Sequence, residues 1–151
     1  MTHSDKIDVL ADSLRLLQSA LRPVTRNVDA GEFDYADLGA VVKATRAKMA
    51  AVGLVAIQSP SGSMVGAVFM ASVTTTIYHC QSEQWIAELS SCPCPPSPRD
   101  YGAAITMLRR YALASMTGLV QAEQIEHAYE HRTLGLNHAQ SLVKARQEAA
   151  K

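Results

Sequence analysis

The sequence predicts an α+β domain in which helices pack on one face of a three-stranded antiparallel meander. Two observations favour this class. Apolar residues recur at spacings of three and four before residue 53 and again after residue 100, as in amphipathic helices. Between them, residues 64–80 are rich in alternating Val, Thr, Ile and Tyr, which is typical of strands. We expect this domain to span residues 1–120, followed by a helical C-terminal extension over residues 121–151.

The first helix is predicted over residues 4–22. Ser4 or Asp5 can cap its N-terminus, and Pro23 ends it because proline cannot continue a helix. We expect its apolar stripe to dock on the core or on a neighbouring subunit, since the stripe is too short for a coiled coil. The stripe consists of Ile7, Leu10, Leu14, Leu17 and Leu21.

A loop over residues 24–33 and a second helix over residues 34–52 are predicted next. The loop contains Asn, Asp and Gly, which form turns readily. In the helix, Lys43 and Arg46 lie beside an apolar face, and Gly53 is a natural end. The residues of this face are Tyr35, Leu38, Val42, Thr45, Met49 and Val52.

Three strands follow in the predicted order. The first covers residues 54–59 and ends in a turn at residues 60–63, where the sequence is PSGS. The second lies within residues 64–80. A polar stretch at residues 81–83 closes a hairpin into the third strand, at residues 84–91, which gives the antiparallel meander.

A proline-rich connector and a third helix complete the predicted domain. Residues 92–98 (CPCPPSP) are expected to lack regular structure because proline removes amide donors and fixes the backbone. The helix runs over residues 100–117, and Gly118 closes it. At ~100° per residue, Arg110 points away from the core face and Arg109 sits at its edge. The core face consists of Ala104, Ile105, Leu108, Tyr111, Ala112, Ser115, Met116 and Leu119.

The formal net charge of zero argues against a protein held to DNA by bulk positive charge. The charge is uneven, however. Residues 1–40 carry four Lys/Arg and seven Asp/Glu, whereas residues 41–120 carry six and three. An anion-binding surface is therefore expected in the middle block. The three cysteines, with Cys92 and Cys94 too close for an unstrained bridge, favour a reducing cytosol over a disulfide framework.

The third helix also carries the most specific motif. It combines GAAIT at residues 102–106, RRYAL at 109–113 and GL at 118–119, and this combination resembles the signature helix of the Erf family of phage recombination proteins. Upstream segments resemble further family elements in the family's order. They are YADL at 35–38, GL at 53–54 with QSP at 58–60, VTTTIYH at 73–79 and EQWI at 83–86.

The sequence departs from the family pattern in three places. Met107 and Leu108 stand where Tyr-Ala is common, and cysteines and prolines fill residues 92–98 in place of a more ordinary connector. Beyond Val120 the chain stays charge-balanced, whereas the family often becomes acidic there. This last departure puts partner binding through the tail in doubt.

The resemblance implies a function, a fold and partners. Erf-like proteins bind single-stranded DNA and anneal complementary strands without ATP, as rings or helical oligomers, in phage recombination and genome circularisation. Their fold is usually related to that of ring-forming eukaryotic strand-annealing proteins. The resemblance thus implies a homo-oligomer in the cytoplasm of the bacterial host, and we expect no enzymatic activity, cofactor or metal. No membrane partner is expected either, because no apolar run approaches the ~20 residues needed to span a membrane. A phage exonuclease and a host single-strand-binding protein are further candidate partners. The chain contains no Gly-rich loop ending in Gly-Lys-Ser/Thr, which agrees with independence from ATP.

Annealing requires a protein that holds the DNA backbone while the base edges stay free, so phosphate contacts should dominate. Arg109 and Arg110 are the main candidates, because arginine pairs with phosphate through two hydrogen bonds. On physical grounds alone a solvated arginine pair is the simpler interpretation, and the resemblance favours the functional one. The other candidate DNA-binding residues are Lys43, Arg46, Lys48 and Arg99, with Tyr35 and Tyr101 either stacking on bases or belonging to the core.

Two other classes of function stay open. One is a ring-forming structural or interaction module that does not anneal DNA. The other is a nuclease or other metal enzyme that uses the His/Glu residues of the tail, although helix-stabilising charge pairs are the simpler interpretation there. Separately, the cysteines with His79 could bind zinc, although reduced thiols are the simpler interpretation. The zinc set is Cys80, Cys92 and Cys94 with His79, and the tail set is His127 and His131 near Glu123, Glu126 and Glu130.

Overall fold

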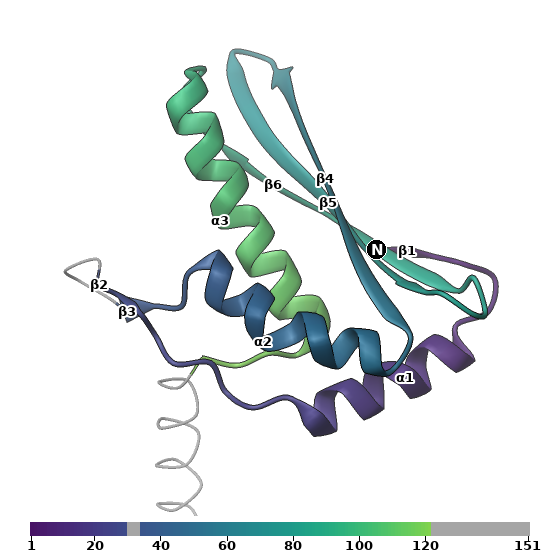
Figure 1. Ribbon diagram of the computed structural model, residues 1–151. Coiled ribbons are helices and arrows are strands. Elements are labelled where there is room, and N and C mark those ends of the chain that lie inside the picture. Colours follow the sequence, from purple (N-terminus) through teal and green to yellow (C-terminus); the bar gives the residue numbers. More distant parts are fainter. Residues whose placement is uncertain (30–33, 122–151) are drawn as a thin grey trace, which may run out of the picture.

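The computed structural model describes residues 1–29 and 34–121, and these form an α+β domain (Figure 1). Within this part of the chain, three helices accompany a four-stranded antiparallel sheet with the order β1-β6-β5-β4. The predicted class is confirmed. The sheet differs from the predicted three-stranded meander, because Thr2–His3 adds the short strand β1 beside β6.

The start of α1 (Asp8–Ala20) differs from the prediction. Its N-cap residue is Ile7, without a side-chain cap, so the expected capping by Ser4 or Asp5 is wrong. The reason is that β1 holds the chain extended along the sheet up to Ser4. The Ser4 hydroxyl accepts a hydrogen bond of 3.0 Å from the Trp85 amide, and the Ser4 amide donates one of 3.0 Å to the Trp85 carbonyl.

The second helix, α2 (Leu38–Ala51), begins four residues later than predicted. Asp37 is its N-cap and accepts a hydrogen bond of 2.6 Å from the Ala40 amide. The preceding residues form β3 (Asp34–Tyr35), which pairs with β2 (Val28–Asp29) in a small separate sheet at one side of the domain (Figure 1). Tyr35 therefore precedes α2 and is not part of its apolar face.

The strands β4 (Leu54–Val65) and β5 (Val68–His79) form one long hairpin whose turn lies at Gly66. The predicted turn at residues 60–63 is wrong, because these residues continue β4 and Pro60 pairs with Val73. Proline is tolerated there since β4 is an edge strand, where a missing amide leaves no neighbouring carbonyl unpaired.

Between β5 and α3, the chain is more regular than predicted. β6 (Trp85–Pro93) continues into the expected connector, and the next helix begins at the connector's last residue. The absence of regular structure predicted for residues 92–98 is therefore wrong for residues 92, 93 and 98. The helix α3 (Pro98–Thr117) begins with Ser97 as N-cap, and Pro98 occupies the first turn, where its missing amide is harmless. Gly118, with φ of 74°, closes α3 in the left-handed conformation, as predicted.

All three helices pack on the same face of the sheet, the side to which the odd-numbered residues of β5 point. Ile77 joins a cluster with side chains from α1, α2 and α3, and Ala71 and Val73 join a second cluster with α3 alone. On the opposite face Ile57 is 53% exposed and Leu89 is 59% exposed. The core is thus one layer of helices over one sheet, and it fixes α2 and α3 beside β4.

Some sequence-based expectations fall outside the described residues. The helical extension beyond Gln121 and part of the loop at residues 24–33 are among them. Gln121 itself forms an isolated parallel bridge with Val24. In the described ranges, no helix is long and apolar enough to cross a membrane.

Candidate nucleic-acid interface

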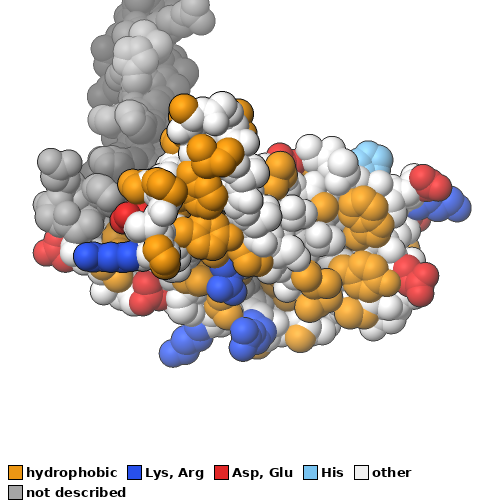
Figure 2. Space-filling model, turned by 90° about the horizontal axis from the view of Figure 1, so that it is seen from above, with side chains coloured by type: hydrophobic (Ala, Val, Ile, Leu, Met, Phe, Trp, Pro, Cys, Tyr) orange, Lys and Arg blue, Asp and Glu red, His pale blue; other side chains and the backbone are white. Residues whose placement is uncertain are grey.

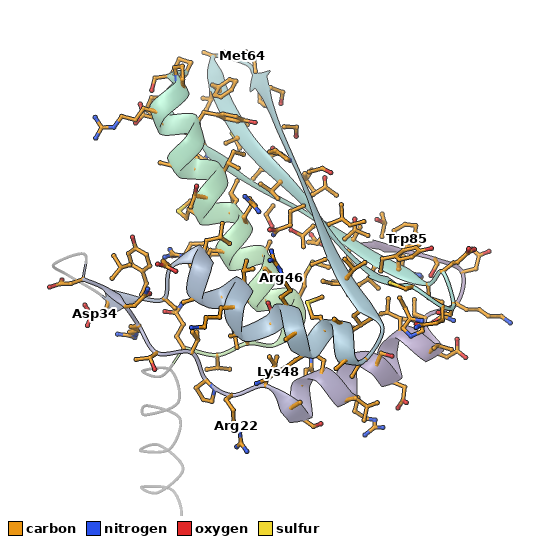
Figure 3. All side chains as sticks on the ribbon, viewed as in Figure 1. Arg22, Asp34, Arg46, Lys48, Met64 and Trp85 are labelled. Carbon is orange, nitrogen blue, oxygen red and sulfur yellow. The ribbon has the colours of Figure 1, made fainter. Side chains whose placement is uncertain are left out.

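A groove with a volume of about 460 Å³ lies between α2, α3 and β4. Among the described residues, its charged lining consists of Arg46 from α2 and Arg109 from α3, and includes no Asp or Glu. Figure 3 shows Arg46 leaving α2 on the side of α3 and β4. The groove combines positive charge with an apolar interior, formed by side chains that include Val42, Met49, Leu54 and Leu113.

The helical period of α2 decides which of its cations reach the groove. Thr45 and Met49 are buried, and Arg46 follows Thr45 by one residue, so it lies at the border between core and solvent. Lys43 is exposed one turn earlier, about 60° from Arg46 around the helix. Lys48 is about 200° from Arg46, and Figure 3 shows it on the opposite side of α2. Arg46 therefore lines the groove, Lys43 lies next to Arg46 on the helix, and Lys48 lies away from the groove.

Arg109 is held at the groove by Gln58 of β4. Its Nε donates to Gln58 Oε1 at 3.2 Å, while Gln58 Nε2 donates to the Arg109 carbonyl at 2.9 Å and to Thr75 Oγ1 at 3.0 Å. Gln58 thus fixes both the backbone and the side chain of Arg109. Within the described residues, the terminal nitrogens of Arg109 form no hydrogen bond or ion pair, so they remain able to bind an anion.

Arg110 does not point to solvent as the helical wheel predicted. It is only 7% exposed, and its guanidinium lies 3.9 Å from the centre of the Tyr35 ring and 4.7 Å from that of Tyr111. One terminal nitrogen donates to the Ala36 carbonyl at 3.4 Å, and Nε is buried without a hydrogen-bond partner. The reason is that β3 and the start of α2 cover this side of α3. Arg110 is therefore a packing residue in this structure.

The segment that covers Arg110 also contains an acidic residue, Asp37, whose negative charge is opposite to that of Arg110. The pKa of Asp37 is lowered, first by the hydrogen bond from the Ala40 amide, then by that from the Asn27 side chain, and also by the positive charge of Arg110. Tyr35, Asp37 and Arg110 line a shallow cavity of about 360 Å³ with Gly102 and Thr106 of α3. The small-residue side of α3, expected to face a partner, is thus partly occupied by this segment.

Arg99 and Tyr101 lie at the other end of α3. Arg99 is exposed in the first turn, and ten residues of helix place it about 15 Å from Arg109 along the axis. The Tyr101 ring packs edge-on against Phe69, with 5.9 Å between ring centres, next to the cluster that contains Ala71. Tyr101 therefore takes the core role that was one of its two interpretations, and neither residue lines the groove.

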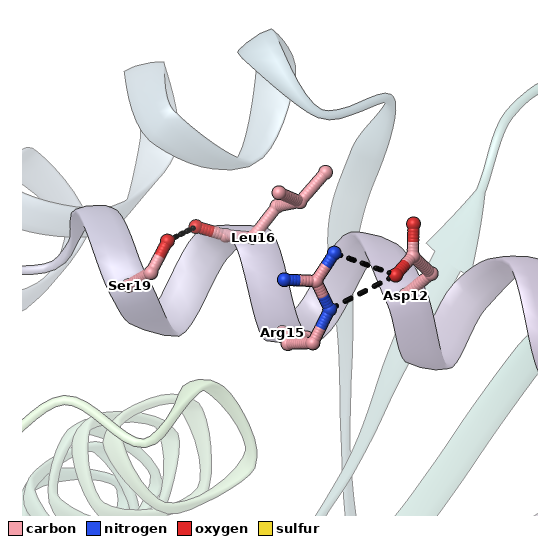
Figure 4. Close-up of polar contacts among 4 residues, drawn as sticks. All are labelled: Asp12, Arg15, Leu16 and Ser19. Atoms are coloured by element: carbon pink, nitrogen blue, oxygen red, sulfur yellow. Dashed lines mark hydrogen bonds and ion pairs between the residues drawn. The ribbon is translucent and has the colours of Figure 1, made fainter.

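The surroundings of Arg46 and Arg109 differ from those of Arg15 on α1. Seen from above, several Lys and Arg side chains gather beside hydrophobic ones, apart from most Asp and Glu side chains (Figure 2). Arg15 on α1, in contrast, binds its own helix neighbour Asp12 through Nε at 3.0 Å and a terminal nitrogen at 2.8 Å (Figure 4). Arg15 thus serves as a reference for an arginine away from the groove.

The metal-site alternatives gain no support from the part of the chain that is described. No group of three or more His, Cys, Asp or Glu residues that could hold a metal ion occurs there. His79 is buried, and its Nδ1 lies 2.8 Å from the Ser82 hydroxyl. Burial, together with the neighbouring Cys94, raises the pKa of the Cys92 thiol. His127 and His131 lie outside the described residues.

Comparison with known sequences places the chain in a family. The sequence model of the ERF superfamily matches residues 10–132. The chain belongs to the ERF superfamily. The resemblance noted from the motifs is confirmed, and the match extends beyond residue 120. Proteins of this superfamily are phage single-strand annealing proteins, which links the chain to single-stranded DNA. No curated protein matches the sequence, and no solved structure matches the fold.

The structure of this ERF-superfamily chain also points to residues that the sequence did not single out. Gln58 belonged to a matched motif, but its contacts with Arg109 span 51 positions of sequence. The sequence feature that could have pointed to Gln58 is its polar amide, which directly follows the apolar residues 54–57 of the predicted strand. Gln81 and Ala50 line the same groove, and nothing in their local sequence marks them.

Proposed function

We propose that this chain binds single-stranded DNA along the groove between α2, α3 and β4 and anneals complementary strands without ATP. The observation that carries the proposal is the pair Arg46 and Arg109 on a groove that, over residues 1–29 and 34–121, is lined by no acidic residue. Phosphate contacts of this kind give affinity independent of base sequence, which strand annealing requires. Membership of the ERF superfamily supports the same function.

The proposal also covers the oligomeric state of the protein and the biological process in which it acts. A single groove with two arginines offers few phosphate contacts, so useful affinity needs the groove to be repeated in a homo-oligomer, as a ring or helix. Such an assembly would act in phage recombination and genome circularisation in the cytoplasm of the bacterial host. It would work without enzymatic activity, together with a phage exonuclease and a host single-strand-binding protein.

The test is annealing of dye-labelled complementary strands at low salt, without ATP or divalent metal. We expect the wild-type protein to accelerate annealing and the variant with both Arg46→Ala and Arg109→Ala to lose most of this acceleration. Arg15→Ala, which removes a single arginine away from the groove, should anneal like the wild type. Failure of the wild-type protein to accelerate annealing would refute the proposed function.

The second candidate, an interaction module that assembles without annealing DNA, is favoured by the face of the sheet opposite the helices, where Ile57 and Leu89 are exposed. The same assay separates the two candidates. Native mass spectrometry with and without an oligonucleotide adds the size of the assembly. An oligomer that neither binds the oligonucleotide nor accelerates annealing would support the interaction module.

A further inference from the structure

We propose that the groove receives one nucleobase of the bound strand, with the flanking phosphates held by Arg46 and Arg109. This inference rests on the proposed function and adds a base-binding subsite to it. Its starting point is that the groove is too large and too apolar for phosphate alone. Its volume is about 460 Å³, within the range of small-molecule sites, and Met49, Leu54 and Leu113 contribute apolar lining.

A phosphate group is poorly suited to this interior. Burying its charge against aliphatic side chains costs free energy unless each oxygen finds a donor. A nucleobase has the opposite requirement, because its faces are apolar and only its edges need hydrogen bonds. The interior matches the base, and the guanidinium groups match the charged phosphates beside it.

The polar groups of the groove fit the edges of a base. The side-chain amide of Gln58 already forms hydrogen bonds with Arg109 and Thr75, so it positions Arg109 and does not recognise the base. Gln81 also lines the groove, is exposed, and has no hydrogen bond within the described residues. A side-chain amide offers both a donor and an acceptor, so it can adapt to different bases. The subsite should therefore tolerate any sequence, as annealing demands.

The occupant is a nucleotide within a strand and not a free nucleotide. The two arginines of one groove can contact only the phosphates next to the bound base, so a single groove binds weakly. A strand that crosses several repeated grooves gains affinity from each groove. One base per groove would be withdrawn while the bases between grooves keep their edges exposed for pairing. The withdrawn base would leave the groove when the complementary strand pairs with it.

Ala50 allows the groove to be filled without touching the core. It is exposed on α2 and lines the groove, one turn after Arg46. The variant Ala50→Leu adds a side chain at the mouth and keeps a good helix former. Ala47→Leu is the matched control, because Ala47 is also exposed on α2 but does not belong to the groove lining.

The experiment measures the affinity of the full chain for a thymidine oligonucleotide and for an abasic oligonucleotide of equal length. For the wild type we expect about tenfold weaker binding of the abasic strand, equivalent to about 1.4 kcal/mol, because an abasic strand has no base to bury in the groove. Ala50→Leu should bind the thymidine strand as weakly as the abasic one and leave abasic binding unchanged. Ala47→Leu should resemble the wild type with both strands, and free thymidine monophosphate at micromolar concentration should not displace either.

Equal wild-type affinity for both strands would overturn the base subsite and leave phosphate binding intact. An equal loss of affinity for both strands in Ala50→Leu would also overturn the base subsite. Displacement by micromolar thymidine monophosphate would overturn it too, since the groove would then be a mononucleotide site. Binding of neither strand by the wild type would refute the proposed function itself. The two failures are therefore distinguishable.

Discussion

Gln58 of β4 and Arg109 of α3 bind each other at two points. The Arg109 Nε donates to Gln58 Oε1 at 3.2 Å, and Gln58 Nε2 donates to the Arg109 carbonyl at 2.9 Å. The amide also bonds to Thr75, which is fully buried on the neighbouring strand. The orientation of the groove arginine thus depends on a neutral amide that links the sheet to the helix and adds no charge of its own.

This relationship predicts that Gln58→Glu weakens binding of single-stranded DNA about tenfold. The carboxylate would pair with the Arg109 guanidinium and compete with phosphate, and a charge-assisted hydrogen bond contributes about 1.5–3 kcal/mol. Fluorescence anisotropy of a labelled oligonucleotide at low salt measures the change. Gln18→Glu adds the same charge on the exposed side of α1 and should have little effect. Wild-type affinity in Gln58→Glu would show that Arg109 does not contact DNA.

The two neighbouring arginines of α3 should separate into different roles. Arg110→Ala is expected to lower the free energy of unfolding by about 2 kcal/mol, because it removes a desolvated cation from the rings of Tyr35 and Tyr111. Arg109→Ala should lower it less but weaken DNA binding more. Urea denaturation and anisotropy on both variants provide the comparison. Equal stability of the two variants would contradict the packing role of Arg110.

Two glycines, one inside α3 and one at its C-cap, predict opposite effects of the same substitution. Gly118 has φ of 74°, so Gly118→Ala should lower the free energy of unfolding by about 1–2 kcal/mol. Gly102 lies within the helix, and a Cβ there meets nothing within 4 Å. Gly102→Ala should therefore raise the free energy of unfolding by up to about 1 kcal/mol. Thermal and urea unfolding test both, and a destabilised Gly102→Ala variant would indicate that this side of α3 is packed against a partner.

The N-cap of α2 predicts part of the response to acid. Hydrogen bonds from the Ala40 amide and the Asn27 side chain lower the pKa of Asp37 in the folded chain, so the unfolded chain binds its proton more readily. The resulting stability is present above the ordinary pKa of about 3.9 and is lost as pH falls through the lower, folded-state pKa. Asp37→Asn should make unfolding less dependent on pH in this acidic range. An unchanged acid profile would contradict this assignment.

The sequence predicted those features that depend on local pattern. The α+β class, the extent of α3 to Gly118 and the pairing of β5 with β6 all follow from periodicity and turn residues close in sequence. The turn at residues 60–63 was wrong because Pro60 and Gly62 break a central strand but not an edge strand, and a strand's place in the sheet is set by its distant partners.

The candidate site shows the same division between local and distant information. Arg46 and Arg109 were both named from the sequence, but their meeting at one groove depends on how α2 and α3 pack. Arg110 was assigned to solvent because a helical wheel cannot include Tyr35, which lies 75 positions away in the sequence and covers it. Gln58 was missed for the same reason, since its role exists only in contact with α3.

The central claim is that Arg46 and Arg109 bind the phosphates of single-stranded DNA. Its most direct test is the salt dependence of the binding constant for a thymidine oligonucleotide, measured for the wild type and for the variant with both Arg46→Ala and Arg109→Ala. Each lost phosphate contact should reduce the slope of log K against log salt by about 0.7. We therefore predict weaker binding and a slope shallower by about 1.4 for each groove that the strand occupies, since each groove loses two contacts. An unchanged affinity and an unchanged slope would contradict the claim.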